Sequence, residues 1–238
     1  MTQAVILAAG NGGRLHPLTA DTPKPLIAVR GRPLIAHVLH ALQEAGVRRA
    51  TIVLGYRAGQ IRSALERTTP AGMTVHFVEN PHYHAGNARS LWAARDAVDG
   101  PFLLAMADHL VDPALLASVL ARRGDRCLLA VDRTYPADPR AAEATLALVE
   151  DGRVLDLGKR IEAWNALDTG VFWCTPAVFD AITHELGDGE AGAVFASLAR
   201  AGQLDAVDVT GAHWLDVDTP EDLAAAEAWL AATPAGVR

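Results

Sequence analysis

An α/β fold with a mainly parallel sheet, helices on both faces and a small β-hairpin insertion is predicted for this chain of 238 residues. In its first half, short apolar runs alternate with segments of helical period, which implies parallel strands joined by right-handed crossovers. In its second half, an Asp-Gly pair joins two apolar runs, a pattern typical of a hairpin. No repeat, low-complexity tract or flexible linker interrupts the sequence. We therefore expect one domain over residues 1–238.

The elements of the first half follow from periodicity. Continuous apolar runs predict buried strands at Ala4–Leu7, Thr51–Leu54, Val75–Val78 and Phe102–Met106. Apolar residues spaced three or four apart predict helices at Pro33–Ala45, Ala58–Arg67 and Asn87–Ala97.

The second half mixes turn signals with shorter runs. The hairpin is expected where Thr145–Val149 and Val154–Leu157 flank Glu150-Asp-Gly-Arg153. Further strands are expected at Cys127–Val131, Gly170–Cys174 and Ala206–Val209, and helices near Pro176 and Glu190. The last helix should begin at Thr219, whose hydroxyl is a good N-cap, with Pro220 in the first helical position.

Composition limits the partners and the compartment. There are 21 basic and 28 acidic residues, a formal net charge of −7, which argues against long nucleic acid as a partner. The two cysteines, Cys127 and Cys174, have neither metal-ligand spacing nor a disulfide framework, as is usual in a reducing cytoplasm. The apolar run Ala4–Gly10 is too short to span a membrane and lacks the flanks of a signal peptide. We expect a cytoplasmic protein without a membrane span.

A glycine-rich loop follows the first strand directly. Small residues from Gly10 to Gly13 let the backbone approach a ligand, and successive N–H groups can surround an anion. The P-loop pattern is absent. A dinucleotide-binding fingerprint would need glycine where Leu15 stands, and no acid closes the strand at Thr51–Gly55. A nicotinamide-dependent oxidoreductase is therefore disfavoured.

Two cations accompany the loop. Arg14 offers a planar fork for phosphate oxygens, and Lys24 is a compact charge held between Pro23 and Pro25. A Gly-x-Gly pair alone would fit an ordinary surface turn with scattered cations. The ordered set through Lys24 favours a phosphate site.

At these residues the sequence resembles the sugar-nucleotide pyrophosphorylases, or NTP-transferase family, whose signature is a first strand, then G-x-G-x-R, P-x-T and P-K-P. The resemblance runs from Val5 to about Ala228. It implies a Rossmann-like fold, transfer of a nucleoside monophosphate from an NTP to a phosphorylated acceptor with release of pyrophosphate, and Mg²⁺ as cofactor. The residues it assigns to the triphosphate are Ala8, Ala9, Gly10, Asn11, Gly12, Gly13, Arg14 and Lys24.

Three aspartates are candidate metal ligands. Asp108 follows the strand Phe102–Met106 closely, at the strand end where open parallel sheets bind ligands, and Asp216 and Asp218 stand just before a helix start. Each alone would also fit a helix cap or turn. The family pattern assigns metal to Asp108 and Asp216, while Asp218 replaces a frequent glycine, so which of the latter two binds metal stays open. The predicted catalytic set is Arg14, Lys24, Asp108 and Asp216.

A second group is expected to contact the base and ribose. Glu79 ends the third strand, and Gly86, Asn87 and Ser90 open the following helix. Asn87 can both donate and accept, as reading a base edge requires, and Ser90 lies one turn further on. The alternative is an N-cap followed by a solvated helix face.

On the acceptor side, the resemblance assigns the acceptor phosphate to Lys159 and the acceptor hydroxyls to the turn Asp168-Thr169-Gly170. A lone lysine after a hairpin is more often simply solvated. The segments Gly86–Leu91, Met106–His109, Leu157–Lys159, Asp168–Phe172 and Trp214–Thr219 look most like inositol-1-phosphate cytidylyltransferases, which implies CTP and inositol 1-phosphate as substrates and CDP-inositol as product.

Several alternatives stay open. Phosphocholine and phosphonate cytidylyltransferases share much of the pattern, as do sugar-1-phosphate nucleotidyltransferases that use another NTP. An inactive regulatory subunit of the same fold is a further reading. Relatives often carry a fused membrane domain that attaches the CDP-alcohol, and this chain stops at Arg238 without a span, so we expect any such CDP-alcohol phosphotransferase to be a separate protein. The sequence leaves a homo-oligomer open.

Overall fold

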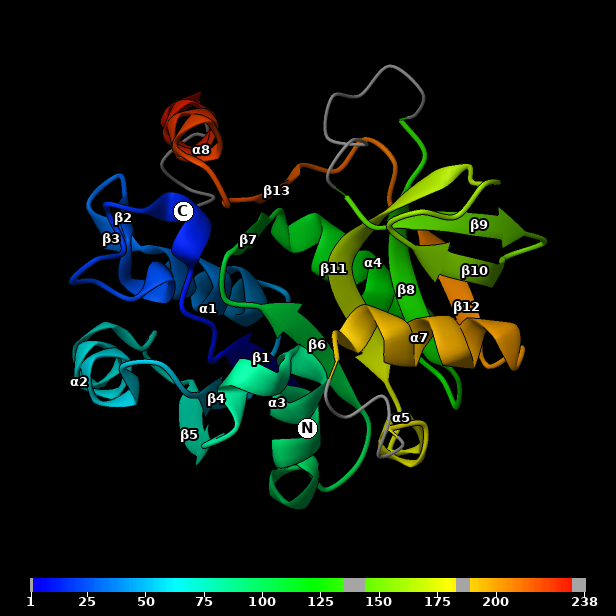
Figure 1. The fold of residues 1–238 in the computed structure, drawn as a ribbon, viewed down its shortest axis with the longest axis horizontal. Helices are drawn as coiled ribbons and strands as arrows, with labels where there is room; N and C mark the ends of the chain where they lie inside the picture. Colours follow the sequence, from blue (N-terminus) through cyan, green and yellow to red (C-terminus); the bar gives the residue numbers. More distant parts are fainter. Residues whose placement is uncertain (1, 135–143, 183–188, 233–238) are drawn as a thin grey trace.

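The computed structural model describes residues 2–134, 144–182 and 189–232. A nine-stranded sheet runs through them in the order β5-β4-β1-β6-β11-β8-β12-β10-β9 (Figure 1). Its strands are β1 (Gln3–Ala8), β4 (Arg49–Leu54), β5 (Thr74–Glu79), β6 (Phe102–Met106), β8 (Cys127–Asp132), β9 (Leu146–Glu150), β10 (Arg153–Gly158), β11 (Ala166–Cys174) and β12 (Leu204–Asp208).

Most strands of this sheet point the same way. β1 is parallel to β4 and β6, β4 to β5, and β8 to β12, whereas β11 is antiparallel to β6 and β8. β10 is antiparallel to β9 and β12. Within this sheet, β10 and β11 therefore run against the rest, and the predicted fold class is confirmed.

Helices cover both faces because the buried strands are apolar on both sides. On β1, Ile6 belongs to one apolar cluster and Val5 and Leu7 to the other, as the alternation of side chains along a strand requires. The first cluster contains α1 (Leu34–Glu44), α2 (Ala58–Thr68) and α4 (Pro113–Arg122). The second contains α3 (Asn87–Ala93), α5 (Ala177–Asp180) and α7 (Ala191–Arg200).

The hairpin β9–β10 forms one edge of the sheet. Asp151 and Gly152 in its turn have φ values of +47° and +77°, the two left-handed residues of a type I′ turn. The hairpin predicted from the Asp-Gly pair is confirmed, but it continues the main sheet instead of standing apart from it.

Smaller elements complete the fold beside the carboxyl end of β6. A ribbon pairs β7 (His109–Val111) with β13 (Trp214–Asp216), and β2 (Ala28–Val29) pairs with β3 (Arg32–Pro33). The helix α8 (Pro220–Ala232) packs on this part through a third apolar cluster. It begins at the expected cap, where the Thr219 hydroxyl accepts from the Asp222 N–H at 3.2 Å and donates to the Asp222 carboxylate at 2.8 Å.

Four local features differ from the predictions. The helix expected to reach Ala97 ends at Ala93 and gives way to a 3-10 turn, Arg95–Ala97. α4 and the β7–β13 ribbon were not predicted. Asp168–Gly170, expected as a turn before a strand, lies inside β11. No helix in the described ranges is long and apolar enough to cross a membrane.

Candidate active site

The glycine loop after β1 packs directly against the lysine segment. Gly12 has a φ of +66°, and a Cβ at this position would lie 2.5 Å from the Cβ of Lys24. The Gly12 carbonyl accepts a hydrogen bond from the Thr19 hydroxyl at 3.0 Å. Only glycine combines this left-handed backbone with so close an approach. The loop and the lysine therefore form one unit.

Lys24 is buried among carboxylates. It lies in a 3-10 turn, Lys24–Leu26, and is 6% exposed. Its Nζ donates to Asp108 Oδ2 at 2.6 Å and to Asp218 Oδ1 at 2.5 Å, and lies 3.7 Å from Asp216 Oδ1. The exposed guanidinium of Arg14 pairs with Asp218 as well. The structure thus brings the predicted catalytic and metal-binding residues into one cluster, namely Arg14, Lys24, Asp108, Asp216 and Asp218.

The β7–β13 ribbon positions two of these aspartates. Asp108 immediately precedes β7, and in the ribbon Asp216 lies opposite His109. β13 is anchored at its other end, where the buried Trp214 Nε1 donates to Asp132 Oδ2 at 2.8 Å. The carboxyl end of β6 and the end of β13 are therefore held side by side.

Burial and charge act against each other in this cluster. Burial would lower the pKa of Lys24, but the surrounding carboxylates, Asp108 first, raise it well above its usual range. Burial would raise the pKa of Asp108, but Lys24 and His109 hold it well below its usual range. Burial does raise the pKa of Asp216. The pKa of His109 is raised to about 9 despite burial, because Asp216 and Asp108 stabilise its positive charge.

The residues fit a divalent cation. Asp108, His109 and Asp216 each offer a ligand atom, and these atoms all lie within 4.8 Å of one another. Asp216 Oδ1 is buried without a hydrogen-bond partner in the described part of the chain, an arrangement that native proteins rarely leave incomplete. Mg²⁺ prefers carboxylate oxygens. Lys24 engages both Asp108 and Asp218, and Arg14 pairs with Asp218 in addition.

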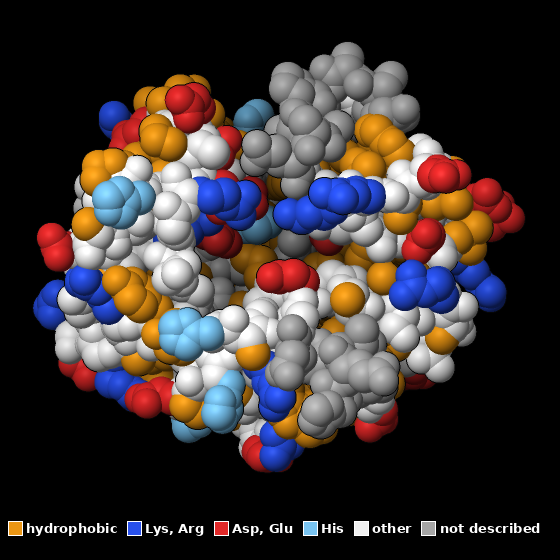
Figure 2. Space-filling view, in the orientation of Figure 1, with side chains coloured by type: hydrophobic (Ala, Val, Ile, Leu, Met, Phe, Trp, Pro, Cys, Tyr) orange, Lys and Arg blue, Asp and Glu red, His pale blue; other side chains and the backbone are white. Residues whose placement is uncertain are grey.

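A cavity of about 610 Å³ opens beside the cluster. Figure 2 shows a hollow near the centre of this face, with basic side chains on both sides and acidic and histidine side chains near them. Most predicted nucleotide and charged residues line the cavity: Ala8, Ala9, Gly10, Asn11, Gly12, Gly13, Arg14, Lys24, Gly86, Asn87, Ser90, Asp108 and Asp218. The cavity is large enough for a nucleotide and is walled on one side by the glycine loop.

The end of the cavity formed by α3 differs in part from the prediction. Asn87 Oδ1 accepts from the Ala191 N–H at the start of α7, and the buried Ser90 hydroxyl accepts from Asn80 Nδ2 at 3.0 Å. Glu79 does not line the cavity, because its carboxylate pairs with Arg62 at 2.8 Å.

Other lining residues were not singled out from the sequence. Tyr83 and His84, whose rings are tilted by 38° with centroids 3.9 Å apart, line the cavity with Glu190. Glu190 directly precedes α7, so the start of that helix was the available signal. The histidines of this loop resembled ordinary surface residues.

The predicted acceptor residues lie outside this cavity. Lys159 is exposed just after β10. The Thr169 hydroxyl donates to the Ala130 carbonyl at 3.0 Å and points into the core, so only its backbone remains for a ligand. Gly170 has a φ of +75°, and a Cβ there would lie 2.4 Å from the His109 ring. The segment Asp168–Gly170 therefore lies beside the aspartate cluster, with the His109 ring between them.

The electrostatics of Asp168 differ from those of the cluster. Its carboxylate accepts from the Gly170 N–H at 2.7 Å. Burial raises the pKa of Asp168 to about 6, although the Gly170 N–H and His109 oppose the shift. Burial of Asp168 therefore favours the protonated form of its carboxyl group.

Comparison with known proteins agrees with this geometry. The sequence profile described as nucleotidyl transferase matches residues 3–233. A "Bifunctional IPC transferase and DIPP synthase" of Aquifex aeolicus (strain VF5) is 32% identical over 97% of the chain, and the chain spans 52% of that protein's length. A 2-aminoethylphosphonate cytidylyltransferase of Lancefieldella rimae is 44% identical over 46% of this chain and 44% of its own.

Among solved structures, the inositol-1-phosphate CTP transferase from T. maritima superposes with a TM-score of 0.83 at 29% identity. The superposition covers 93% of this chain and 91% of that one. The family profile spans nearly the whole chain, and the fold agrees with it. The chain belongs to the nucleotidyl transferase family.

Proposed function

We propose that this chain transfers CMP from CTP to inositol 1-phosphate and releases CDP-inositol and pyrophosphate. The observation that carries the proposal is the buried Lys24, held against Asp108 and Asp218 in a cavity walled by the glycine loop. The similarity to the inositol-1-phosphate CTP transferase supports the choice of substrates.

In the proposed reaction, an oxygen of the acceptor phosphate attacks the α-phosphorus of CTP. The bond from that phosphorus to the oxygen bridging the β-phosphorus breaks, and pyrophosphate leaves. No proton transfer is needed, so positioning and charge stabilisation supply the catalysis. The backbone of Gly10–Gly13 with Arg14 and Lys24 would hold the triphosphate, and Lys159 would hold the acceptor phosphate.

Asp108 and Asp216 would hold Mg²⁺, which when bound neutralises charge on the triphosphate. His109 keeps this carboxylate pair oriented, since its Nδ1 lies 3.0 Å from Asp108 Oδ1 and 3.6 Å from Asp216 Oδ1. Lys24 and Arg14 already hold the Asp218 carboxylate between them, one at each of its oxygens. The same two cations are suited to phosphate oxygens, which have the same charge and similar hydrogen-bond geometry.

The proposed base end of the cavity offers a hydrogen-bond donor. Because Asn87 Oδ1 is occupied by the Ala191 N–H, the side-chain amide of Asn87 is left as a hydrogen-bond donor. Cytosine presents acceptors at O2 and N3. A donor from Asn87 therefore matches cytosine in this part of the cavity.

The test is pyrophosphate release from CTP, UTP, GTP and ATP, each with inositol 1-phosphate, with and without Mg²⁺. We expect the highest kcat/KM with CTP and Mg²⁺, and a product with the mass of CDP-inositol. Efficiency roughly tenfold higher with 2-aminoethylphosphonate, phosphocholine or glucose 1-phosphate, about 1.4 kcal/mol in the transition state, would overturn the acceptor but keep the reaction class.

The assay also tests two other functions. The relative that acts on 2-aminoethylphosphonate favours that acceptor as the second candidate. An inactive subunit would release no pyrophosphate with any pair of substrates. The intact cluster of Arg14, Lys24, Asp108 and Asp216 argues against it, since a subunit free of catalytic selection has no reason to keep buried like charges together.

A further inference from the structure

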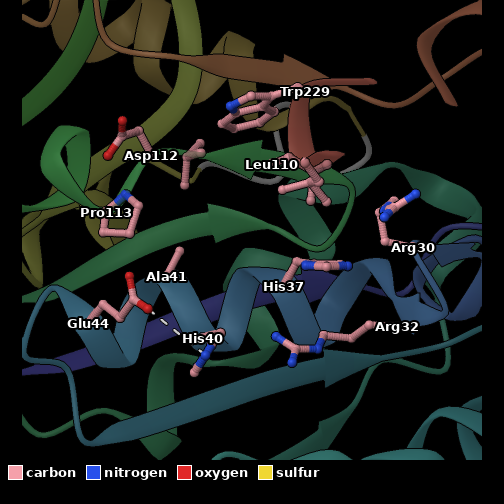
Figure 3. A pocket seen from close by; sticks show the side chains of 12 residues that line it. Arg30, Arg32, His37, His40, Ala41, Glu44, Leu110, Asp112, Pro113 and Trp229 are labelled. Carbon is pink, nitrogen blue, oxygen red and sulfur yellow. Dashed lines mark ion pairs between the residues drawn. The ribbon is translucent and has the colours of Figure 1, made fainter. Parts of the chain in front are cut away.

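Two cavities in the described part of the chain differ in how charge is arranged around them. A cavity of about 210 Å³ lies between α1, β7 and α8. Figure 3 shows both signs of charge on its walls, Arg30 and Arg32 together with Glu44 and Asp112. Mixed charge of this kind selects neither an anion nor a cation. The nucleotide cavity, by contrast, carries one carboxylate that its cations do not account for.

That carboxylate belongs to Glu190. Asp108 and Asp218, which also line the nucleotide cavity, both accept from Lys24, and Asp218 pairs with Arg14 as well. Glu190 forms no ion pair with a residue that the structure describes, and its carboxylate accepts no hydrogen bond from one. Because this charge repels phosphate oxygens, its natural partner in the cavity is a part of the ligand that donates hydrogen bonds.

The backbone of Glu190 is fixed against the start of α3. The Ala88 N–H donates to the Gly189 carbonyl at 3.0 Å, and the Ala191 N–H donates to Asn87 Oδ1. Glu190 lies between these two contacts, one residue from each. Glu190 and Asn87 are therefore held next to each other at the end of the cavity that α3 forms.

Together the two side chains offer an acceptor beside a donor. Asn87 presents its amide N–H groups, since Oδ1 is occupied, and Glu190 presents carboxylate oxygens. Cytosine has the complementary pair, an N4 amine beside the acceptor N3, and adenine has the same pair at N6 and N1. Uracil and guanine present the reverse, a carbonyl oxygen beside an N–H, so that a carbonyl oxygen would face the carboxylate.

We propose that Glu190 determines base specificity: its carboxylate accepts from the exocyclic amine of the nucleotide, N4 of cytosine, while Asn87 Nδ2 donates to the adjacent ring nitrogen. A carboxylate that accepts from cytosine N4 is an established form of base recognition, and its repulsion of uracil O4 rejects the competing nucleotide. This inference rests on the proposed function, in which the triphosphate lies against the glycine loop and leaves the end at α3 for the base. The similarity to the inositol-1-phosphate CTP transferase supports cytosine over adenine.

The test measures the dissociation constants of CTP and UTP by calorimetry, with Mg²⁺ and without any acceptor. The wild type should bind CTP about tenfold more tightly than UTP. Glu190→Gln should reduce this preference about fivefold or more, because a glutamine amide can accept from N4 of cytosine or donate to O4 of uracil.

A nucleotide analogue isolates the contact with the amine. The triphosphate of the cytidine analogue that lacks the N4 amine should bind the wild type about tenfold more weakly than CTP does. Glu190→Ala should bind CTP and the analogue with equal affinity, since neither then has a partner at this position.

Glu150→Gln is the matched control. Glu150 is an exposed carboxylate at the end of β9 and does not line the cavity, so this variant should keep the wild-type preference. Both Glu190 variants should melt close to the wild-type temperature, because the carboxylate loses no partner within the described residues.

Three results would overturn the role of Glu190: a wild type that binds UTP as tightly as CTP, a wild type that binds the analogue as tightly as CTP, or a Glu190→Gln variant in which both nucleotides weaken equally. The last result would assign the carboxylate to the ribose or to a general effect of charge.

The binding assay and the proposed function fail separately. The assay contains no acceptor, so it decides the role of Glu190 even if inositol 1-phosphate releases no pyrophosphate. If ATP binds more tightly than CTP and Glu190→Ala weakens ATP, Glu190 still recognises an amino base and CTP fails as the substrate. A preference for CTP that survives in Glu190→Gln overturns the inference and leaves the proposed reaction intact.

Discussion

The proposed nucleotide side and the proposed acceptor side of the site are built in different ways. The nucleotide side comes mainly from one continuous stretch, Gly10 to Lys24, folded so that Gly12 touches Lys24. The acceptor side is assembled from separate segments: Lys159 after β10, and Asp168–Gly170 within β11 against His109. The first side is a local motif, whereas the second depends on strand pairing across the sheet.

The two sides also differ in charge compensation. Lys24 and Arg14 are paired with carboxylates on the nucleotide side. On the acceptor side, Lys159 is exposed and forms no ion pair with a described residue, and burial raises the pKa of Asp168 to about 6. The charges of the proposed nucleotide side are paired within the protein, whereas Lys159 on the proposed acceptor side is left to solvent or to a ligand. Four substitutions test this difference.

The largest effect is expected at Asp216. Asp216→Asn removes a charge needed to hold Mg²⁺, so turnover should be lost at millimolar Mg²⁺. The variant should fold at least as stably as the wild type, because burial already disfavours the charged carboxylate. Pyrophosphate release over a Mg²⁺ titration, with a thermal melt, measures both.

Asp218→Asn is the matched control, since that carboxylate is engaged by Lys24 and Arg14. It should retain turnover with an ordinary Mg²⁺ requirement. The reverse pattern, with Asp218 essential and Asp216 dispensable, would show that Asp218 and not Asp216 is the metal ligand.

Lys24→Ala should lower kcat about 10²–10³-fold, the scale of losing one preorganised contact to transition-state charge, ~3–4 kcal/mol. It should also destabilise the fold, because a buried pair that loses one partner costs about 3–5 kcal/mol. The double variant Lys24→Ala/Asp218→Asn separates the two effects: stability should partly return and activity should not. Recovery of turnover in the double variant would remove Lys24 from the mechanism.

Asp168→Asn should change how stability depends on pH. A carboxyl whose pKa is raised on folding binds its proton more tightly in the native state, so the wild type loses stability as pH rises from about 4 to about 6. The loss is at most about 3 kcal/mol for a shift of this size. Urea unfolding at pH 4, 5, 6 and 7 gives the free energy of unfolding of each protein. The free energy of the wild type relative to that of Asp168→Asn should fall between about pH 4 and about pH 6 and then level off. A difference that is constant with pH would contradict the burial of Asp168.

Lys159→Ala should have the smallest effect. An exposed lysine that holds the acceptor phosphate contributes about 1.4 kcal/mol or less, so the KM of the acceptor should rise up to about tenfold. The KM of CTP should stay the same. Arg160→Ala, the exposed neighbour, is the control, and an equal effect of both variants would show only a general surface charge.

Where the local signal was strong, the fold was predictable. The alternation of apolar runs and helical segments predicted β1, β4, β5 and β6 to within a few residues, and the Asp-Gly pair predicted the β9–β10 turn. α4 carried a usable signal that was overlooked, an N-cap at Asp112 followed by Pro113. The β7–β13 ribbon had none, because strands of three residues from distant segments are specified only by their pairing.

The residues of the site divide in the same way, into those that a local motif predicts and those that depend on contacts between distant segments. The glycine loop and Lys24 were predictable because neighbouring residues form that motif. Glu79 shows the limit: a strand end gives the position of a residue but not the direction of its side chain, which here pairs with Arg62. The contact of His109 with both Asp108 and Asp216 arises only when β13 lies beside β7.

The register shift in β11 also has an evolutionary consequence. β11 pairs with β8 at Leu167 and Asp168 and again at Phe172 and Trp173, and the register shifts between them. Inside the shift, Gly170 leaves room for the His109 ring, and the Thr169 hydroxyl donates to the Ala130 carbonyl of β8. A bulge redirects a short segment while the strand stays paired on either side. Selection should therefore preserve these two positions as a pair, and a new acceptor preference should arise through changes in other segments.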